Sequence, residues 1–227
     1  MGEKMKLDDI VEVVENRRND LVLRDEMVEV IDYGAGNPQD NRTKEEMILG
    51  KKLKISLSNL ANTGIRGERM MNVYKIISEI NPKTILELGT CCGFSSSYMS
   101  FFAPNSKIYT IEGSPNIAEI AKENHRFFGL SNVSVFVGRF DIVLPKLLEE
   151  ISPIDFAFID GHHDREATLS YFKQILPFMA KGGVMLFDDI AWSEGMKEAW
   201  REIVDFGVYK KIQEVGEEPW KMGVLWL

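Results

Sequence analysis

From about residue 83 onward, short apolar or β-branched runs alternate with longer amphipathic stretches. The apolar runs predict strands over 84–88, 107–112, 133–137, 154–160 and 183–188. The stretches between and after them predict helices over 94–102, 115–128, 142–150, 165–179 and 194–205. This alternation is typical of an α/β fold, in which helices cover a parallel sheet.

The end of the chain departs from this pattern. Two strand-like runs, 208–215 and 222–227, are joined by Gly216, Glu217, Glu218 and Pro219, which leaves no room for a crossover helix. A connection this short predicts an antiparallel hairpin.

Residues 1–82 have a different pattern. Apolar positions between Ile10 and Leu23 predict an early helix, and the runs 47–60 and 70–80 predict two more. A polar, turn-rich loop over 33–43 separates the first helix from the others. We therefore expect two parts: a helical N-terminal extension, 1–82, on the substrate side, and a sheet domain, 83–227.

Composition narrows the function classes. With 27 Lys plus Arg against 35 Asp plus Glu, the formal net charge is −8, which disfavours a nucleic-acid binder. A hydrophobic content of 44% is sufficient for a large core, and the apolar runs are too short to span a membrane. The two cysteines, Cys91 and Cys92, are adjacent and cannot link distant segments, so we expect a reducing, cytoplasmic setting. The sequence leaves open whether the chain forms a homodimer.

Two glycine-containing segments are candidates for a nucleotide-binding loop: 32–36 and 87–93. Such a loop requires a preceding strand, a tight turn, a helix start, and an acid at the end of the next strand to bind ribose hydroxyls. Only 87–93 meets all four, because the next strand ends at Glu112. The segment Gly34–Gly36 is more simply a structural turn.

Acidic side chains end two neighbouring predicted strands. Asp160 ends one strand and is followed by His162 and His163, while Asp188 and Asp189 end the next. The carboxyl ends of adjacent parallel strands face one crevice, where three carboxylates would repel each other without a cation. A divalent ion, Mg²⁺ above all, would resolve this repulsion. The alternative is that these acids cap a helix or bind an amino group.

The pattern Glu87-x-Gly89-x-x-x-Gly93, with Glu112 on the next strand, resembles motif I of the class I S-adenosylmethionine methyltransferases. The resemblance implies a Rossmann-like seven-stranded sheet with a C-terminal antiparallel hairpin, and it assigns the first three residues to the cofactor loop and Glu112 to the ribose. The other residues that it assigns to the cofactor are Thr90, Gly113, Arg139, Phe140 and Asp160. Arg139 stands where such enzymes usually carry Asp.

The strand-end acids resemble those of catechol-type, metal-dependent O-methyltransferases. The resemblance implies that Asp160, Asp188 and Asp189 bind Mg²⁺, although Asp189 replaces the Asn of that family. His163 stands where the family has the Lys that removes the hydroxyl proton, and His162 is the rival base. The extension and the 32–36 segment resemble those of a group of bacterial class I methyltransferases.

These observations predict a methyltransferase that transfers a methyl group from S-adenosylmethionine to a hydroxyl of a small molecule on a metal ion, with Asp160 and one histidine in catalytic roles. The alternatives are a metal-independent N- or O-methyltransferase, a nicotinamide-dependent dehydrogenase and a non-catalytic cofactor-binding module. The side chain at Cys91 disfavours the dehydrogenase, whose loop would have glycine there. The acceptor cannot be identified from the sequence.

Overall fold

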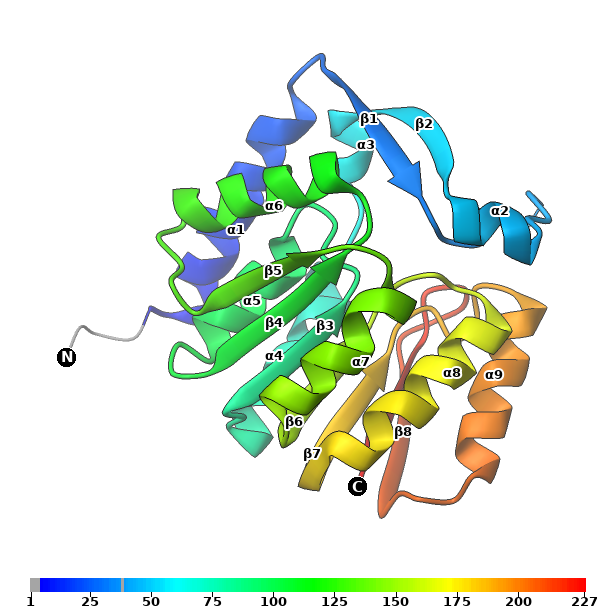
Figure 1. Ribbon diagram of the computed structural model, residues 1–227. Helices are drawn as coiled ribbons and strands as arrows, with labels where there is room; N and C mark the ends of the chain where they lie inside the picture. Colours follow the sequence, from blue (N-terminus) through cyan, green and yellow to red (C-terminus); the bar gives the residue numbers. More distant parts are fainter. Residues whose placement is uncertain (1–4, 38) are drawn as a thin grey trace.

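The computed structural model describes residues 5–37 and 39–227, and its centre is a seven-stranded sheet (Figure 1). The strand order is β5-β4-β3-β6-β7-β9-β8. The first five strands in this order run parallel, and β9 pairs antiparallel with both β7 and β8. The strands are β3 (Thr84–Leu88), β4 (Lys107–Glu112), β5 (Val133–Val137), β6 (Ile154–Ile159), β7 (Met179–Phe187), β8 (Lys211–Val215) and β9 (Met222–Trp226).

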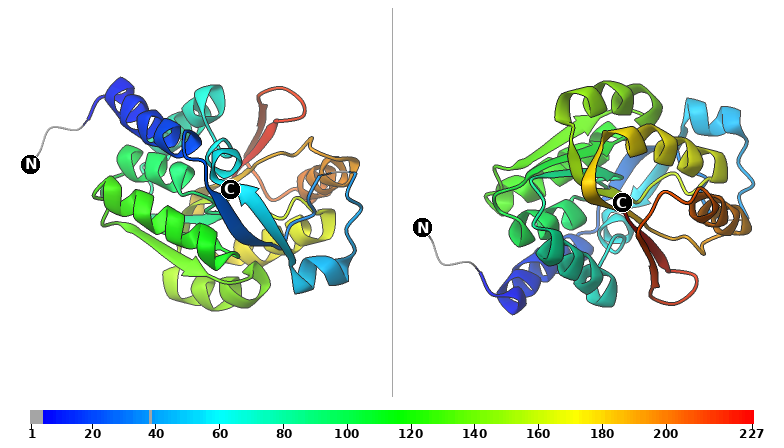
Figure 2. Two further views of the ribbon diagram at one scale, coloured as in Figure 1. Left: turned by 90° about the horizontal axis from the view of Figure 1, so that it is seen from above. Right: turned by 90° about the horizontal axis from the view of Figure 1, so that it is seen from below.

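Helices cover both faces of this sheet (Figures 1 and 2). The helices that follow the first sheet strands are α5 (Phe94–Phe102), α6 (Pro115–Phe127), α7 (Phe140–Ile151), α8 (Arg165–Ile175) and α9 (Glu194–Asp205). A short 3-10 turn, Leu176–Phe178, follows α8. The strands, helices and C-terminal hairpin expected from 83 onward are thus confirmed, with shifts of a few residues at their ends.

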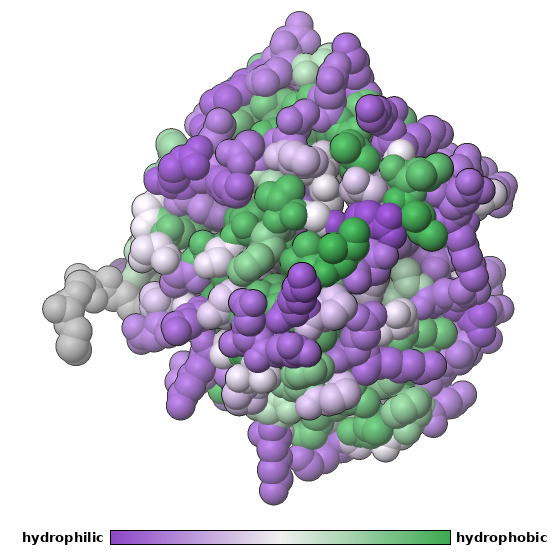
Figure 3. All heavy atoms as spheres, viewed as in Figure 1, coloured by the Kyte–Doolittle hydropathy of each residue, from purple (hydrophilic) through white to green (hydrophobic). Residues whose placement is uncertain are grey.

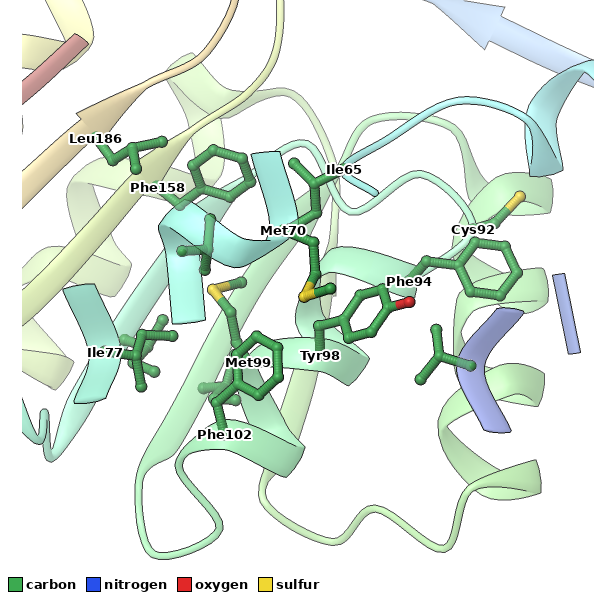
Figure 4. Close-up of a cluster of buried hydrophobic side chains, with 14 of the residues drawn as sticks. Ile65, Met70, Ile77, Cys92, Phe94, Tyr98, Met99, Phe102, Phe158 and Leu186 are labelled. Carbon is green, nitrogen blue, oxygen red and sulfur yellow. The ribbon is translucent and has the colours of Figure 1, made fainter. Parts of the chain in front are cut away.

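Two buried clusters explain why successive residues of the central strands are apolar. Ile85, Phe156 and Phe158 pack with the helices of one face, whereas Leu86 and Ala157 pack with α7, α8 and α9 on the other. Figure 4 shows part of the first cluster, where Phe158 and Leu186 of the sheet meet side chains of the covering helices. A strand buried on both faces loses the alternation of apolar and polar positions and becomes continuously apolar.

The N-terminal extension is only partly helical. It contains α1 (Leu7–Val22), α2 (Lys44–Leu49), α3 (Leu57–Ala61) and α4 (Gly67–Ile80), together with an antiparallel pair, β1 (Met27–Asp32) and β2 (Lys51–Ser56). The expected helix over 47–60 is therefore wrong, because a strand interrupts it. The signal was present: Leu53 and Ile55 alternate with lysines at period two, and Val28 and Val30 are buried while Glu29 between them is exposed.

The β1–β2 pair stands beyond the carboxyl ends of the sheet strands (Figure 1). Hydrophilic side chains cover most of the face seen in Figure 3, with smaller apolar areas between them. Among the described residues, no helix is long and apolar enough to cross a bilayer.

Candidate active site

A cavity of about 950 Å³ lies where the sheet strands end. Its floor comes from the loops after β3, β4 and β6, and the N-terminal extension supplies the opposite wall. The lining from the extension includes Tyr33, Ile48, Thr63 and Arg69. The two parts of the chain that the sequence separated at about residue 82 thus share one cavity.

Gly89, in the loop after β3, packs directly against Asp160, in the loop after β6. Its φ is +99°, and a Cβ placed on it would lie 1.8 Å from the carbonyl oxygen of Asp160. Both the backbone conformation and the contact require glycine at this position. The glycine loop and the predicted metal-binding loop are therefore in direct backbone contact.

Glu112, at the end of β4, is held by two backbone amides. Its carboxylate accepts hydrogen bonds from the amide of Cys91 at 2.9 Å and from that of Ser114 at 2.8 Å. Burial raises the pKa of Glu112 to about 7, although these amide hydrogen bonds favour the ionised form. The carboxylate lines the cavity, as a ribose-binding acid should.

Two predicted cofactor residues lie beneath the cavity wall. Glu87 is fully buried, its Oε2 accepts a hydrogen bond from the Thr110 hydroxyl at 2.5 Å, and burial raises the pKa of its carboxyl to about 8. Gly93 faces His125 and Ala121 of α6. These positions indicate that Glu87 and Gly93 shape the loop from behind, while Gly89 and Thr90 line the cavity.

Arg139, Phe140 and Gly113 line the same cavity. Arg139 donates to Asp141 at 3.0 Å and to the Ile48 carbonyl of α2 at 2.6 Å. Phe140 packs edge-on against Tyr171, with ring centroids 5.5 Å apart. The loops after β4 and β5 thus form one end of the cavity, where the sequence predicts the adenine and ribose.

Asp160, His163 and Asp189 meet at the other end. Each offers one ligand atom, and these atoms all lie within 4.8 Å of one another. The Nε2 of His163 is 3.8 Å from Asp160 Oδ1 and 4.0 Å from Asp189 Oδ2. Burial raises the pKa of Asp160 to about 6, a rise that His163 opposes and Asp189 reinforces.

Asp188 does not belong to this group of ligand atoms. Its side chain is fully buried and forms an ion pair with Arg69 of α4. Arg69 also lies 3.5 Å from Asp189 Oδ1. The structure thus brings together two of the three predicted metal-binding acids, Asp160 and Asp189, with His163 beside them. The third acid, Asp188, instead forms an ion pair with Arg69.

His162 lies on the cavity wall and its Nδ1 is 2.8 Å from the Tyr171 hydroxyl. Burial lowers the pKa of this imidazole, so the ring is neutral near pH 7. Both candidate bases therefore face the cavity, in different surroundings.

Four cavity-lining residues other than glycine adopt positive φ: Cys91 at 46°, His162 at 71°, His163 at 50° and Asp189 at 53°. Residues other than glycine rarely adopt a positive φ, and each instance costs about 1–3 kcal/mol of conformational energy. Such strain often marks functional sites.

The segment 32–36 forms part of the cavity wall, although the sequence favours a structural turn. The amide of Ala35 donates to the carbonyl of His162 at 2.7 Å, and Tyr33 packs over Gly113. Sequence reasoning also missed Arg69 and Tyr171, because one amphipathic helix does not reveal which of its polar residues faces a distant loop.

Comparison with known proteins identifies the sheet domain. Residues 86–190 match the family described as "Methyltransferase domain". Catechol O-methyltransferase of Sus scrofa is 31% identical over 119 residues, which are 51% of this chain and 64% of that protein. The Niastella koreensis enzyme of the same name is 35% identical over 111 residues, 48% of this chain and 49% of its own. The chain thus spans about half to two thirds of the length of these curated relatives.

Solved structures agree in fold. An O-methyltransferase from Bacillus cereus, determined in complex with SAH, has a TM-score of 0.67 at 17% identity and covers 98% of this chain and 93% of its own. TomG of Streptomyces achromogenes, an O-methyltransferase, has a TM-score of 0.63 at 17% identity. The alignment covers 98% of this chain and 99% of TomG. Residues 86–190 therefore match a methyltransferase domain, and the sheet domain resembles those of the catechol O-methyltransferases in sequence and of the bacterial O-methyltransferases in fold.

Proposed function

We propose that the chain is an S-adenosylmethionine-dependent O-methyltransferase that uses a divalent metal ion to methylate a hydroxyl group of a small molecule. The observation that carries this proposal is the junction at Asp160. Its carbonyl oxygen lies against Gly89 of the cofactor loop, and its carboxylate belongs to the group with His163 and Asp189. One cavity therefore contains a proposed cofactor-binding end, here called the nucleotide end, and a proposed metal-binding end, here called the metal end. The two ends meet at Asp160.

The nucleotide end suits S-adenosylmethionine. Gly89 lets the loop pass directly against the Asp160 peptide, and Glu112 keeps lone pairs free after accepting two amide hydrogen bonds, so it could bind ribose hydroxyls. Phe140 offers an aromatic face near that end, and Arg139 fixes α2 over it. We assign Glu87, Thr90, Gly93 and Gly113 to shaping this end.

The metal end suits a divalent cation on charge grounds. Three carboxylates, Asp160, Asp188 and Asp189, lie near a single guanidinium, that of Arg69, which leaves two negative charges uncompensated. Asp189 Oδ1 is buried and, within the described residues, has no hydrogen-bond partner. The carboxylates suit Mg²⁺ or Mn²⁺, whereas His163 as a third ligand would favour a transition-metal ion over Mg²⁺.

When bound there, the cofactor supplies the methyl group and the metal ion lowers the pKa of the acceptor hydroxyl. We assign Asp160, His163 and Asp189 to holding the ion, and Arg69 to neutralising Asp188. His162 then takes the hydroxyl proton: with Nδ1–H donating to Tyr171, its Nε2 is free to accept. The extension reduces the access of water to the cavity, because Tyr33 and residues of the 62–66 segment form part of its wall.

The experiment combines calorimetry with an activity assay. Wild-type protein should bind S-adenosylmethionine, methylate members of a panel of catechols and phenols, lose activity with EDTA and regain it with Mg²⁺ or Mn²⁺. Asp160→Asn should bind the metal at least tenfold more weakly, and Glu166→Gln, which changes an exposed carboxylate of the same cavity, should not.

Two outcomes would overturn parts of the proposal. Full activity in EDTA would favour the metal-independent alternative, in which Arg69 supplies the positive charge. Failure of the folded wild-type protein to bind S-adenosylmethionine would remove the methyltransferase function altogether.

A further inference from the structure

α1 makes two polar connections to the cofactor end of the cavity, and both come from adjacent arginines. Arg18 is 1% exposed, yet it belongs to a helix on the periphery of the fold (Figure 1). Arg17 is its neighbour in the same helix. Neither residue lines the cavity itself; each acts on a segment that does.

Arg18 binds three carbonyl oxygens of one irregular segment. Its Nη1 donates to Ala61 at 2.8 Å and to Thr63 at 2.7 Å, and its Nη2 donates to Ile65 at 3.1 Å. The intervening residues 62–64 line the cavity. Ala61 ends α3, and residues 63–66 lie outside any helix or strand before α4 begins, so the guanidinium fork substitutes for a backbone partner of these carbonyls.

The same guanidinium reaches the helix behind the glycine loop. It lies 4.2 Å from the ring centroid of Phe94, the first residue of α5 and part of the cavity wall. Its Nε donates to Glu15 at 3.1 Å, and Glu15 in turn accepts from the Tyr98 hydroxyl at 2.8 Å. Figure 4 shows Ile65, Phe94 and Tyr98 in the buried cluster where these segments meet.

Arg17 reaches the glycine loop from the other side. Its Nε donates to Asn124 Oδ1 at 2.8 Å, and Asn124 Nδ2 donates to the carbonyl of Cys92 at 2.8 Å. Asn124 is fully buried, so its hydrogen bond to Cys92 is shielded from water. The two loops also meet each other, because the Thr63 hydroxyl lies 3.1 Å from the Cys91 thiol.

We propose that α1 is a brace for the cofactor pocket, and that Arg18 and Arg17 are positioning residues that hold segment 61–65 and loop 89–92 together in the cofactor-binding conformation. Burial of one arginine against three carbonyls of a cavity wall fixes that wall before any ligand arrives. Such preorganisation reduces the ordering cost of binding. The proposal rests on the proposed function only for the identity of the ligand.

The test uses Arg18→Lys, which keeps the charge but cannot bridge three carbonyls. The matched control is Ile203→Ala, which truncates a buried side chain of α9 in the cluster on the opposite sheet face and lowers stability by other means. Two readouts need no ligand: the hydrogen-exchange rates of amides 62–66, and the labelling rate of Cys91 by N-ethylmaleimide in a Cys92→Ser background. The third is calorimetric affinity for S-adenosylmethionine.

Arg18→Lys should accelerate both exchange and labelling and should weaken cofactor binding by about tenfold or more, the change that loss of one charged hydrogen bond produces. Ile203→Ala should change none of the three by more than about twofold. Wild-type exchange and labelling rates in Arg18→Lys would overturn the brace, whatever the outcome for the cofactor. Absence of cofactor binding in the wild type would overturn the proposed function and leave the first two readouts decisive for the brace.

If Arg18→Lys does not fold, Arg17→Gln tests the second connection. It removes the contact with Asn124 and should accelerate Cys91 labelling relative to Ile203→Ala. Labelling at the wild-type rate would overturn the proposal.

Discussion

Arg69 and Asp188 form an ion pair between the first turn of α4 and the end of β7, where the carboxylate is fully buried. This pair connects the N-terminal extension to the sheet at the acidic end of the cavity. With Asp188 paired in this way, Asp160 and Asp189 are the two carboxylates of the metal site that we propose.

Removal of one partner should destabilise the fold strongly. Arg69→Met leaves the Asp188 carboxylate buried and unpaired, which should lower the free energy of unfolding by about 3–5 kcal/mol. The double variant Arg69→Met/Asp188→Asn removes both charges and should recover much of that loss. Chemical denaturation of the wild type, Arg69→Met, Asp188→Asn and the double variant measures the coupling energy between the two residues. Strictly additive losses of stability would contradict a direct pair.

Gly89→Ala should disrupt the junction between the two loops. The new Cβ cannot fit 1.8 Å from the Asp160 carbonyl, so the loop must move, and we expect a loss of stability of about 3 kcal/mol or more. Gly129→Ala is the matched control, because Gly129 also has positive φ, +67°, with nothing within 4 Å of its Cβ position. The control should lose only about 1–2 kcal/mol, the cost of the conformation itself. Equal losses in thermal unfolding would show that the contact is unimportant.

Glu87 should make stability fall as pH rises. Burial raises the pKa of its carboxyl from 4.5 to about 8 in the folded protein, so between these values the folded state holds a proton that the unfolded state releases. The resulting stabilisation is complete below pH 4.5 and is lost as pH rises through about 8. Glu87→Gln, which cannot ionise, should therefore gain stability relative to the wild type across this range.

The free energies of unfolding of the wild type and of Glu87→Gln are measured at pH 5, 6.5 and 8, and their difference is followed with pH. Each pKa unit between the folded and unfolded states corresponds to a change of about 1.4 kcal/mol in this difference. Using the difference removes the contributions of titrating groups that do not interact with Glu87. A difference that does not change with pH would contradict a buried, protonated Glu87.

The two histidines should separate metal binding from proton transfer. His163→Ala should weaken Mn²⁺ binding at least tenfold, because the imidazole lies between Asp160 and Asp189. His162→Ala should leave Mn²⁺ affinity unchanged and lower the methyl-transfer rate by about 10²–10⁴-fold, the usual contribution of a general base. Calorimetry and a coupled assay measure the two effects, and the reverse result would make His163 the base.

Most of the sheet domain could be predicted from the sequence because its central strands, β3 and β6 among them, are buried on both faces and its strands are bounded by clear turns. Thr84–Leu88 and Val133–Val137 begin and end where the apolar runs predict. The β1–β2 pair was missed because it contacts the core through one face only, so its period-two pattern is short and mixed with lysines. Local patterns identify such strands poorly when tertiary contacts decide them.

The residues of the candidate site also fall into those that the sequence predicts and those that it does not. Asp160, Asp189 and Glu112 were predictable, since strand topology alone brings them to one edge. Asp188 and Asp189 could not be told apart, because the turn at Asp189, with φ of 53°, and the arrival of Arg69 from α4 are both long-range outcomes. The contribution of residues 33–35 was equally invisible, since it depends on how the extension folds back onto His162.

The backbone contact between Gly89 and Asp160 has a consequence for the order of binding events. A ligand that shifts the glycine loop must also shift the Asp160 peptide, so the nucleotide and metal ends of the cavity cannot adjust independently. Thermodynamic linkage then requires the effect to be mutual: occupancy of either end changes the affinity of the other by the same factor. The order in which the two ligands bind therefore does not change their combined affinity, and whichever ligand binds first alters the affinity of the protein for the second.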